Sequence, residues 1–224
     1  MPDSESSSVK TTRIRLIYEK RGRACFVPHV ALSTLFARAA RRAGMELSRT
    51  EGFSPHAKIS FGPELPAGVA ALNEPVDMWL KTREDITEGN RHVFLDSVIG
   101  ALNSQMPEGF RVTKCIFPAE GAGVLGKECK AAHYLVWTRN EPSPAELLSY
   151  MERHYREALL NGFIEEYKQA AFSRISAVLA DPAQNGIGGL VKALVADRVI
   201  AGWHDMCVVR MALGRWNGER VEPI

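Results

Sequence analysis

Residues 12–44 read TRIRLIYEKRGRACFVPHVALSTLFARAARRAG, and this stretch decides the fold. Apolar and polar side chains alternate over 12–20, which is the pattern of a half-buried β-strand. Over 29–43 apolar residues recur every three to four positions, which predicts an amphipathic helix that begins after Pro28 and ends at Gly44. A strand that leads into a helix in this way indicates a domain of mixed α and β structure.

The following residues extend this pattern. Short strands are predicted over 45–48 and 57–61, an alternating strand over 76–81, a helix over 90–105 and a strand over 110–117. The order reads β-α-β-β-α-β, which is the ferredoxin-like plan with two helices on one face of an antiparallel sheet.

The second half of the chain follows the same plan more faintly. The predicted elements are a strand over 132–138, a helix over 144–159, strands over 162–168 and 172–180, a helix over 188–196 and a strand over 206–213. No sequence repeat relates the halves, so the duplication rests on the order of elements alone. We predict an α+β protein of two tandem ferredoxin-like units with antiparallel sheets.

Composition divides the chain into five parts. Residues 1–10 are Ser-rich and acidic and predict a disordered tail, whereas the glycine-containing stretch 118–130 has no periodicity and predicts a linker. The first domain is therefore expected over 11–117, the second over 131–214, and a polar tail over 215–224. No run approaches the roughly 18–20 apolar residues of a membrane helix, and no hydrophobic stretch follows the start as in a signal peptide. We expect a cytoplasmic protein with no membrane partner.

The four cysteines carry no metal or disulfide signature. Cys25, Cys115, Cys129 and Cys207 are far apart and form no C-x-x-C pair. Three of the four lie in apolar segments, where cysteine behaves as a small core residue. We therefore expect reduced cysteines, no metal and no cofactor.

The net charge of +2 hides a strongly basic region. Between Lys10 and Ser60 there are eleven Lys and Arg residues and three acids, so this stretch carries +8 and the remainder −6. Such a region attracts polyanions by electrostatic steering and counterion release, although an Arg-rich helix face can also be merely solvated. The expected nucleic-acid-binding side chains are Arg38, Arg41, Arg42, Arg49, Ser54, His56 and Lys58.

Residues 51–58 read EGFSPHAK and predict a shaped loop rather than a flexible linker. Gly52 permits positive φ, and Pro55 holds Ser54 extended. Such a loop would project Ser54, His56 and Lys58 toward phosphate or ribose; the alternative is a structural turn with a surface histidine. The residues that shape the loop are Gly52, Phe53 and Pro55.

His29 is a second candidate, at the first turn of the predicted helix. The positive end of the helix dipole disfavours an imidazolium there and leaves a neutral ring as base or ligand. Together with His56 it could perform acid–base chemistry on RNA, but two histidines without a third ligand do not make a metal site. The alternative is that both histidines are structural.

Several residues after Cys25 form a recognisable pattern. They are Phe26, His29, Arg38, Arg41, Arg42, Gly44, Gly52, Phe53, Pro55, His56, Leu65, Pro66 and Gly68. In these residues the chain resembles the radical-SAM-linked protein family, bacterial domains of unknown function encoded beside, or fused to, radical S-adenosylmethionine proteins. The family usually has Ser at the position of Pro28, Asp at Ala31, Arg at Thr34 and Asn at Ser54. The loss of an acidic and a basic group at the helix start weakens a catalytic role.

The resemblance implies a ribosome or RNA context, because gene neighbours of the family often include a ribosomal-RNA-processing nuclease and ribosomal proteins. We expect a non-catalytic accessory protein directed to RNA or a ribosomal component, with a radical S-adenosylmethionine protein as partner. The alternatives are a metal-independent RNA-processing enzyme that uses His29 and His56, or a protein-binding scaffold. The tandem plan also resembles that of CRISPR repeat-processing endoribonucleases, a likeness of architecture that does not carry function.

Overall fold

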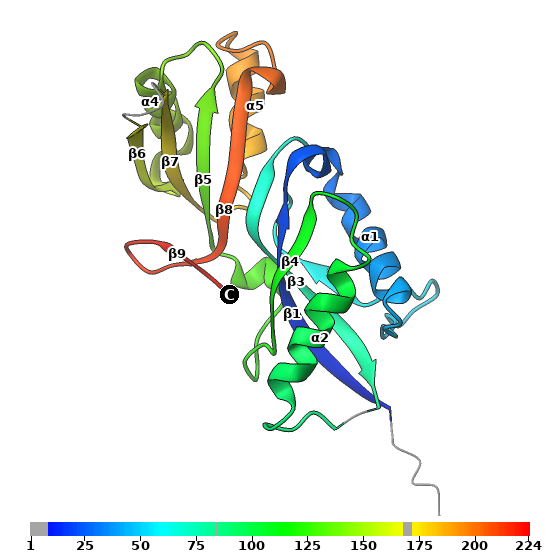
Figure 1. Ribbon diagram of the computed structural model, residues 1–224. Helices are drawn as coiled ribbons and strands as arrows, with labels where there is room; N and C mark the ends of the chain where they lie inside the picture. The colour runs from blue at the N-terminus through cyan, green and yellow to red at the C-terminus, as the bar shows by residue number, and fades with distance from the viewer. Residues whose placement is uncertain (1–8, 84, 168–171) are drawn as a thin grey trace, which may run out of the picture.

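The computed structural model describes residues 9–83, 85–167 and 172–224 (Figure 1). Its strands are β1 (Lys10–Lys20), β2 (Ile59–Phe61), β3 (Ala70–Thr82), β4 (Phe110–Ile116), β5 (Ala131–Thr138), β6 (Leu159–Tyr167), β7 (Phe172–Ala180), β8 (Met206–Trp216) and β9 (Val221–Pro223). Its helices are α1 (His29–Arg42), α2 (Arg91–Asn103), α3 (Leu125–Glu128), α4 (Pro144–Tyr155) and α5 (Ile187–Ala196), with 3₁₀ turns at Gly22–Phe26, Arg156–Ala158 and Trp203–Asp205. The predicted tail residues 1–8 and the end of the predicted strand at residue 168 lie outside the described residues.

The described strands form one sheet in the order β4-β1-β3-β8-β5-β7-β6, with β2 paired to β3 and β9 paired to β8. All pairings are antiparallel except that of β3 with β8, so the predicted mixture of helices with antiparallel strands is confirmed. The expectation of two separate sheets is wrong. Strand β3 begins at Ala70, before the predicted start at residue 76, and its Ala70 and Ala71 pair in parallel with Val209 and Arg210 of β8.

In the N-terminal half (residues 10–117), α1 and α2 cover the same face of the sheet (Figure 1). Leu32 and Phe36 of α1 and Leu102 of α2 are buried against Ile14 of β1 and Met78 of β3. Ile14 and Met78 stand opposite each other in the antiparallel register, so one cross-strand pair lies at the centre of this core.

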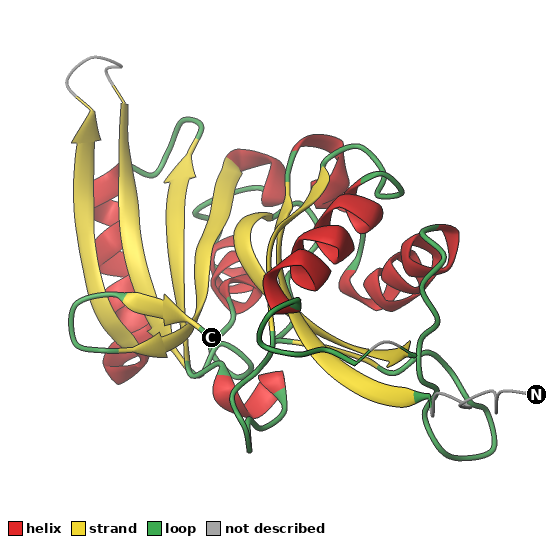
Figure 2. Cartoon of the chain, turned by 60° about the horizontal axis from the view of Figure 1, so that its bottom comes forward, coloured by secondary structure: helices red, strands yellow, loops and turns green. Residues whose placement is uncertain are grey.

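In the C-terminal half (residues 131–224), α4 and α5 cover the sheet in the same manner (Figure 2). Met151 of α4 and Leu194 of α5 belong to one buried cluster with Tyr134 of β5 and Ile175 of β7. Ser143 caps α4 by accepting a hydrogen bond from the backbone N–H of Glu146, whose carboxylate accepts one from the Ser143 N–H in return. Leu65 and Val69, which precede and lead into β3, also belong to this cluster, so the two halves share apolar packing.

Helix α1 forms as its periodicity predicts. Pro28 precedes it with extended backbone, and the helix ends at Arg42, two residues before Gly44 with φ 75°. Leu32, Phe36 and the two alanines at 39 and 40 are buried, which leaves the basic side chains on the outer side.

Three segments differ from prediction. Residues 45–48 form no strand; Leu47 makes a single bridge with Leu80. The predicted linker 118–130 contains α3, and its carbonyls at Ala122 and Gly123 accept hydrogen bonds from Arg13, which draws the segment onto the sheet. The predicted polar tail 215–224 turns back as β9, because its apolar Val221 is buried.

Among the described residues, no helix combines the length and the apolar character needed to cross a membrane. The cysteines at 25, 115 and 129 are buried and that at 207 is half-buried, all as free thiols. Burial raises the pKa of Cys115 and of Cys129 to about 12, so both thiols are protonated at neutral pH.

Candidate nucleic-acid interface

A hollow of about 560 Å³ lies beside the C-terminal part of α1; we call it the basic hollow. It is lined by Ser33, Thr34, Ala37, Arg38, Arg41, Met45, Glu46, Leu47, Arg49, His56, Ala57 and Lys81. The lining therefore comes from α1, from the segment that follows it, from the end of the 51–56 loop, and from β3. Four of the predicted contact residues meet here, namely Arg38, Arg41, Arg49 and His56.

Helical geometry brings the first two arginines together. Arg38 and Arg41 are three residues apart in α1, which makes them neighbours on the helix surface, and both side chains are exposed. The buried stripe of α1 faces the sheet, so these two guanidiniums point away from the core into the hollow.

Backbone pairing closes the 51–56 loop and brings its end to the hollow. The backbone N–H of Thr50 donates to the carbonyl of His56 at 2.8 Å, and that of Lys58 donates to the carbonyl of Ser48 at 2.7 Å. The His56 ring is held on the loop, with Nδ1 3.1 Å from Thr50 Oγ1 and 3.3 Å from the carbonyl oxygen of Ser54. Gly52 has φ 122°, a backbone conformation that L side chains rarely adopt, so the predicted demand for glycine is present at this position.

The charge of the hollow is positive and largely uncompensated. Its acid is Glu46, whose carboxylate accepts a 2.6 Å hydrogen bond from Lys81 Nζ, and that hydrogen bond lowers the pKa of Glu46. Within the described parts of the chain, no carboxylate lies within ion-pair distance of the guanidinium of Arg38, Arg41 or Arg49. Three guanidiniums are thus available to an anion, and guanidiniums bind phosphate oxygens in bidentate fashion.

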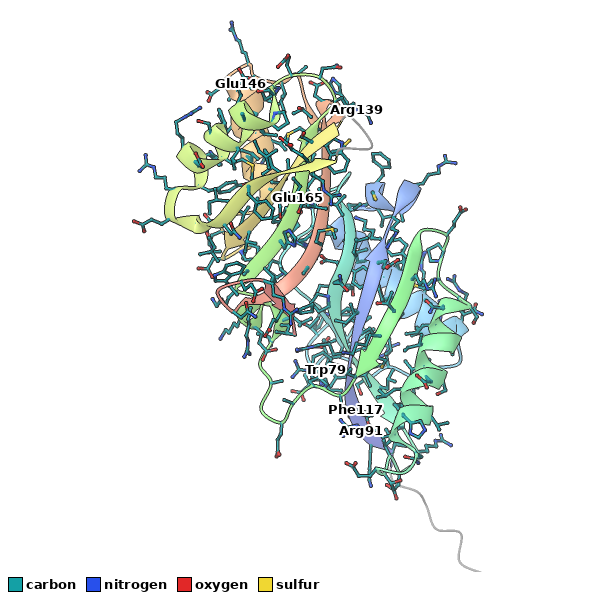
Figure 3. All side chains as sticks on the ribbon, turned by 60° about the vertical axis from the view of Figure 1, so that its left-hand side comes forward. Trp79, Arg91, Phe117, Arg139, Glu146 and Glu165 are labelled. Carbon is teal, nitrogen blue, oxygen red and sulfur yellow. The ribbon has the colours of Figure 1, made fainter. Side chains whose placement is uncertain are left out.

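Three predicted contact residues, Arg42, Ser54 and Lys58, lie outside the lining of the hollow. Arg42 Nη2 donates to the carbonyl of Gln105 at 2.9 Å, so this arginine is turned toward the end of α2. Lys58 Nζ lies 4.8 Å from the centroid of the Trp79 ring. The Cζ atom of Arg13 lies 5.2 Å from the same centroid, so both cations contact this ring. Figure 3 shows Trp79 in the N-terminal half, toward the same end of the molecule as Phe117 and Arg91. Ser54 lies in the exposed part of the loop.

His29 has different surroundings from His56. Its ring packs against Phe61 at 5.6 Å between centroids, and its buried Nδ1 has no hydrogen-bond partner among the described residues. Burial, followed by the charge of Arg210, lowers the pKa of His29, so the ring is neutral at pH 7. No described hydrogen bond or ring contact joins His29 to His56.

Sequence reasoning missed a charged group buried where the two halves meet, which we call the junction centre (Lys20, Glu74, Tyr134 and Arg210). The Arg210 side chain is completely buried and donates to both carboxylate oxygens of Glu74. Burial opposes the charge of Arg210, but the Glu74 carboxylate and Tyr134 together outweigh it, and the pKa of Arg210 is raised. Lys20 is also fully buried; its Nζ donates to the carbonyl of Val27 at 2.7 Å, and burial lowers its pKa.

No group of three or more His, Cys, Asp or Glu side chains suited to a metal ion occurs within the described ranges. The basic hollow offers cations and hydroxyls, which suit anions rather than metal ions.

The chain belongs to a bacterial family. Residues 13–176 match the family described as "Uncharacterized protein conserved in bacteria (DUF2344)". The comparison with curated proteins found no match. A solved structure, described as "Crystal Structure of an Unknown Protein from Galdieria sulphuraria", aligns with 90% of this chain and 99% of that chain at 11% sequence identity and a TM-score of 0.27. That likeness is too low to carry an argument about fold or function.

Proposed function

We propose that this chain is a non-catalytic accessory protein that binds RNA phosphates in the basic hollow. The observation that carries the proposal is the convergence of Arg38, Arg41 and Arg49 on one hollow without a carboxylate within ion-pair distance in the described residues. The His56 ring, which also lines the hollow, adds a further hydrogen-bonding group.

The chemistry of the hollow favours phosphate over other anions of the cell surface or cytosol. An RNA backbone presents one negative charge per nucleotide and releases condensed counterions when several arginines bind it together. Arginine forks match the oxygens of a phosphate better than a lysine does. The hollow is open to solvent and lined by exposed and half-buried residues, as a site for a large ligand requires.

The non-catalytic character of the proposal rests on the surroundings of the two histidines. His29 packs in a half-buried position against Phe61, whereas His56 is exposed on its loop. General acid–base chemistry with both rings would require the two to reach one substrate within hydrogen-bond distance or through one water.

A radical S-adenosylmethionine protein and a ribosomal component are the partners that the sequence resemblance implies. They remain part of the proposal, together with a cytoplasmic location. Membership of the bacterial family of residues 13–176 is compatible with these partners and does not identify them. Affinity purification of the full chain from a bacterial host, with the bound RNA and proteins identified, tests both partners at once.

We also infer that each half is a ferredoxin-like unit. The N-terminal half has the strand order β4-β1-β3 with β2 on β3, and the C-terminal half has β8-β5-β7-β6. Numbered within each half, both orders read 4-1-3-2 with two helices on one face, which agrees with the β-α-β-β-α-β plan.

Salt dependence tests the proposed function. The affinity of the full chain for a structured RNA is measured at about 50, 100 and 200 mM salt, and the slope of log K against log salt concentration is determined. Two or three phosphate contacts predict a slope of roughly −1.5 to −3. Absence of binding, or an affinity that does not change with salt, contradicts the proposal.

A further inference from the structure

Phe53 has no cover from the rest of the described chain. Its side chain is fully exposed, with a relative accessibility of 106%, the highest of the exposed large hydrophobic residues. It stands in the exposed part of the 51–56 loop, between Gly52 and Pro55. Figure 1 shows the chain after α1 as a loop that projects beyond the C-terminal end of this helix. An aromatic ring held out in this way gains free energy only when a ligand or partner covers it.

The ring is close to the basic hollow. His56 lines the hollow, and three chain steps separate it from Phe53, so their Cα atoms lie at most about 11 Å apart. That limit is comparable to the span of one or two nucleotides. An apolar platform therefore stands beside His56, at the edge of a hollow that three unpaired guanidiniums also line.

This combination of groups matches an unpaired nucleotide. The guanidiniums attract phosphates, and an exposed aromatic ring stacks on the face of a base. Base faces are hidden inside a duplex, so a duplex would use the arginines but leave the Phe53 ring without a stacking partner.

We propose that the basic hollow and Phe53 together bind single-stranded RNA, with Phe53 stacked on an unpaired base and the arginines on the adjacent phosphates. This inference rests on the proposed function and adds its substrate class. The charge of the neighbouring hollow favours RNA over an apolar protein groove as the occupant, since a protein groove would cover Phe53 but leave three guanidiniums without partners.

The experiment compares the full chain with Phe53→Ala and Phe53→Trp on three fluorescent probes. The probes are a ten-nucleotide single-stranded RNA of mixed sequence, the same strand with its bases removed at the four central positions, and the duplex of the first strand with its complement. The abasic strand keeps every phosphate and loses only bases. Because the Phe53 side chain is fully exposed, both variants are expected to fold, and thermal unfolding checks this.

Phe53→Ala should lower the affinity for the single strand by about 5- to 150-fold, the range of base–aromatic stacking, and Phe53→Trp should preserve it. The unaltered chain should bind the abasic strand as weakly as Phe53→Ala binds the intact strand. For Phe53→Ala, the affinities for the abasic and the intact strand should be equal. The duplex should bind the unaltered chain and Phe53→Ala equally well, and the salt slope should be the same for both proteins.

The outcomes separate the two proposals. If Phe53→Ala binds the single strand as tightly as the unaltered chain, the stacking inference is wrong, while salt-dependent binding that depends on the arginines still supports the proposed function. If Phe53→Ala keeps its RNA affinity but no longer co-purifies with a protein that the unaltered chain retains, the ring serves a protein partner and the inference is also wrong. If the unaltered chain binds none of the RNA probes, both proposals fall.

Discussion

Arg210 of β8 donates hydrogen bonds to both carboxylate oxygens of Glu74 on β3, across the junction of the two halves of the chain. The Nε–Oε1 distance is 2.6 Å, and the second arm runs from Nη2 to Oε2. The two side chains are 0% and 4% exposed, and Arg210 also donates to the carbonyls of Pro63 and Glu64 at 3.1 Å each. Because β3 and β8 share only a short parallel pairing, this buried ion pair is an important polar interaction between the two halves.

Replacing one member of the pair should be strongly destabilising. Arg210→Met leaves the Glu74 carboxylate buried without its partner, and we expect the free energy of unfolding to fall by about 3–5 kcal/mol. Urea denaturation of the full chain, followed by circular dichroism, measures this loss.

The double variant Glu74→Met and Arg210→Met should recover much of the lost stability, because neither buried charge then remains. Arg215→Ala is the matched control, since its exposed guanidinium lies 3.5 Å from Glu128 at the surface, and it should cost about 1 kcal/mol or less. Losses that simply add in the double variant would show that the two side chains act independently.

Two histidines should make the fold sensitive to mild acid. Burial lowers the pKa of both His29 and His133 below their usual 6.5, so the unfolded chain binds more protons than the folded chain in the range below 6.5. Their contribution to stability is therefore complete above pH 6.5 and is lost as the pH falls toward the folded pKa values. We expect the free energy of unfolding to decrease between pH 7 and pH 5 for the unaltered chain.

The variants His29→Asn and His133→Asn should each flatten that decrease, and the double variant should flatten it most. The lowered pKa values of Glu46, Asp85 and Glu146 act in a separate, lower range, below their usual values near 4. A double variant whose stability declines between pH 7 and pH 5 as steeply as that of the unaltered chain would refute this assignment.

Gly52→Ala should reduce RNA affinity and leave global stability nearly unchanged. The φ of 122° is strained for alanine, but no atom lies within 4 Å of the added Cβ, so the exposed loop can shift without disturbing the core. The shift moves His56 and Phe53 relative to the hollow. Affinity for single-stranded RNA and the unfolding temperature are the two measurements.

Gly100→Ala provides the control, because Gly100 lies in α2 with ordinary φ and open space around its Cβ position. It should leave RNA affinity unchanged and raise helix stability by up to about 1 kcal/mol. Equal RNA affinity of Gly52→Ala and the unaltered chain would contradict the role given to the loop.

His56→Ala separates binding from catalysis. We expect a loss of affinity of about 2- to 10-fold, as for one lost hydrogen bond worth about 1 kcal/mol, and no RNA cleavage by either protein. His92→Ala, at an exposed position on α2 outside the hollow, should bind like the unaltered chain. Cleavage of purified RNA by the unaltered chain that disappears in His56→Ala would favour the enzymatic alternative instead.

The sequence was sufficient to predict α1 and the outward position of two of its arginines. The 3.6-residue period separates the buried Leu32 and Phe36 from the outward Arg38 and Arg41 without reference to the rest of the chain. The position of Arg42 depends instead on the carbonyl of Gln105, which α2 brings near from 63 residues away. Local periodicity cannot predict such a contact.

The junction centre was missed because the predicted strand began at residue 76, after Glu74. The alternation of Val76, Met78 and Leu80 extends back to Glu74 on the same buried face, and Pro75 between them is a residue type that interrupts strand patterns. Arg210 likewise occupies an inward position of β8, whose buried and half-buried residues alternate from Met206 onward. An inward charged residue on each of two strands was the available signal, but the partner of each lies 136 residues away.

The central claim is that the arginines of the basic hollow bind RNA phosphates, and matched triple variants test it most directly. One variant carries Arg38→Ala, Arg41→Ala and Arg49→Ala; the other carries Arg111→Ala, Arg139→Ala and Arg220→Ala, three exposed arginines outside the hollow. Both lose the same net charge. The measurement is the slope of log K against log salt for the ten-nucleotide single-stranded RNA. We predict that the hollow variant reduces the steepness of the slope by about 2, as for three lost phosphate contacts, and that the control changes it little. Equal slopes for the two variants would contradict the claim.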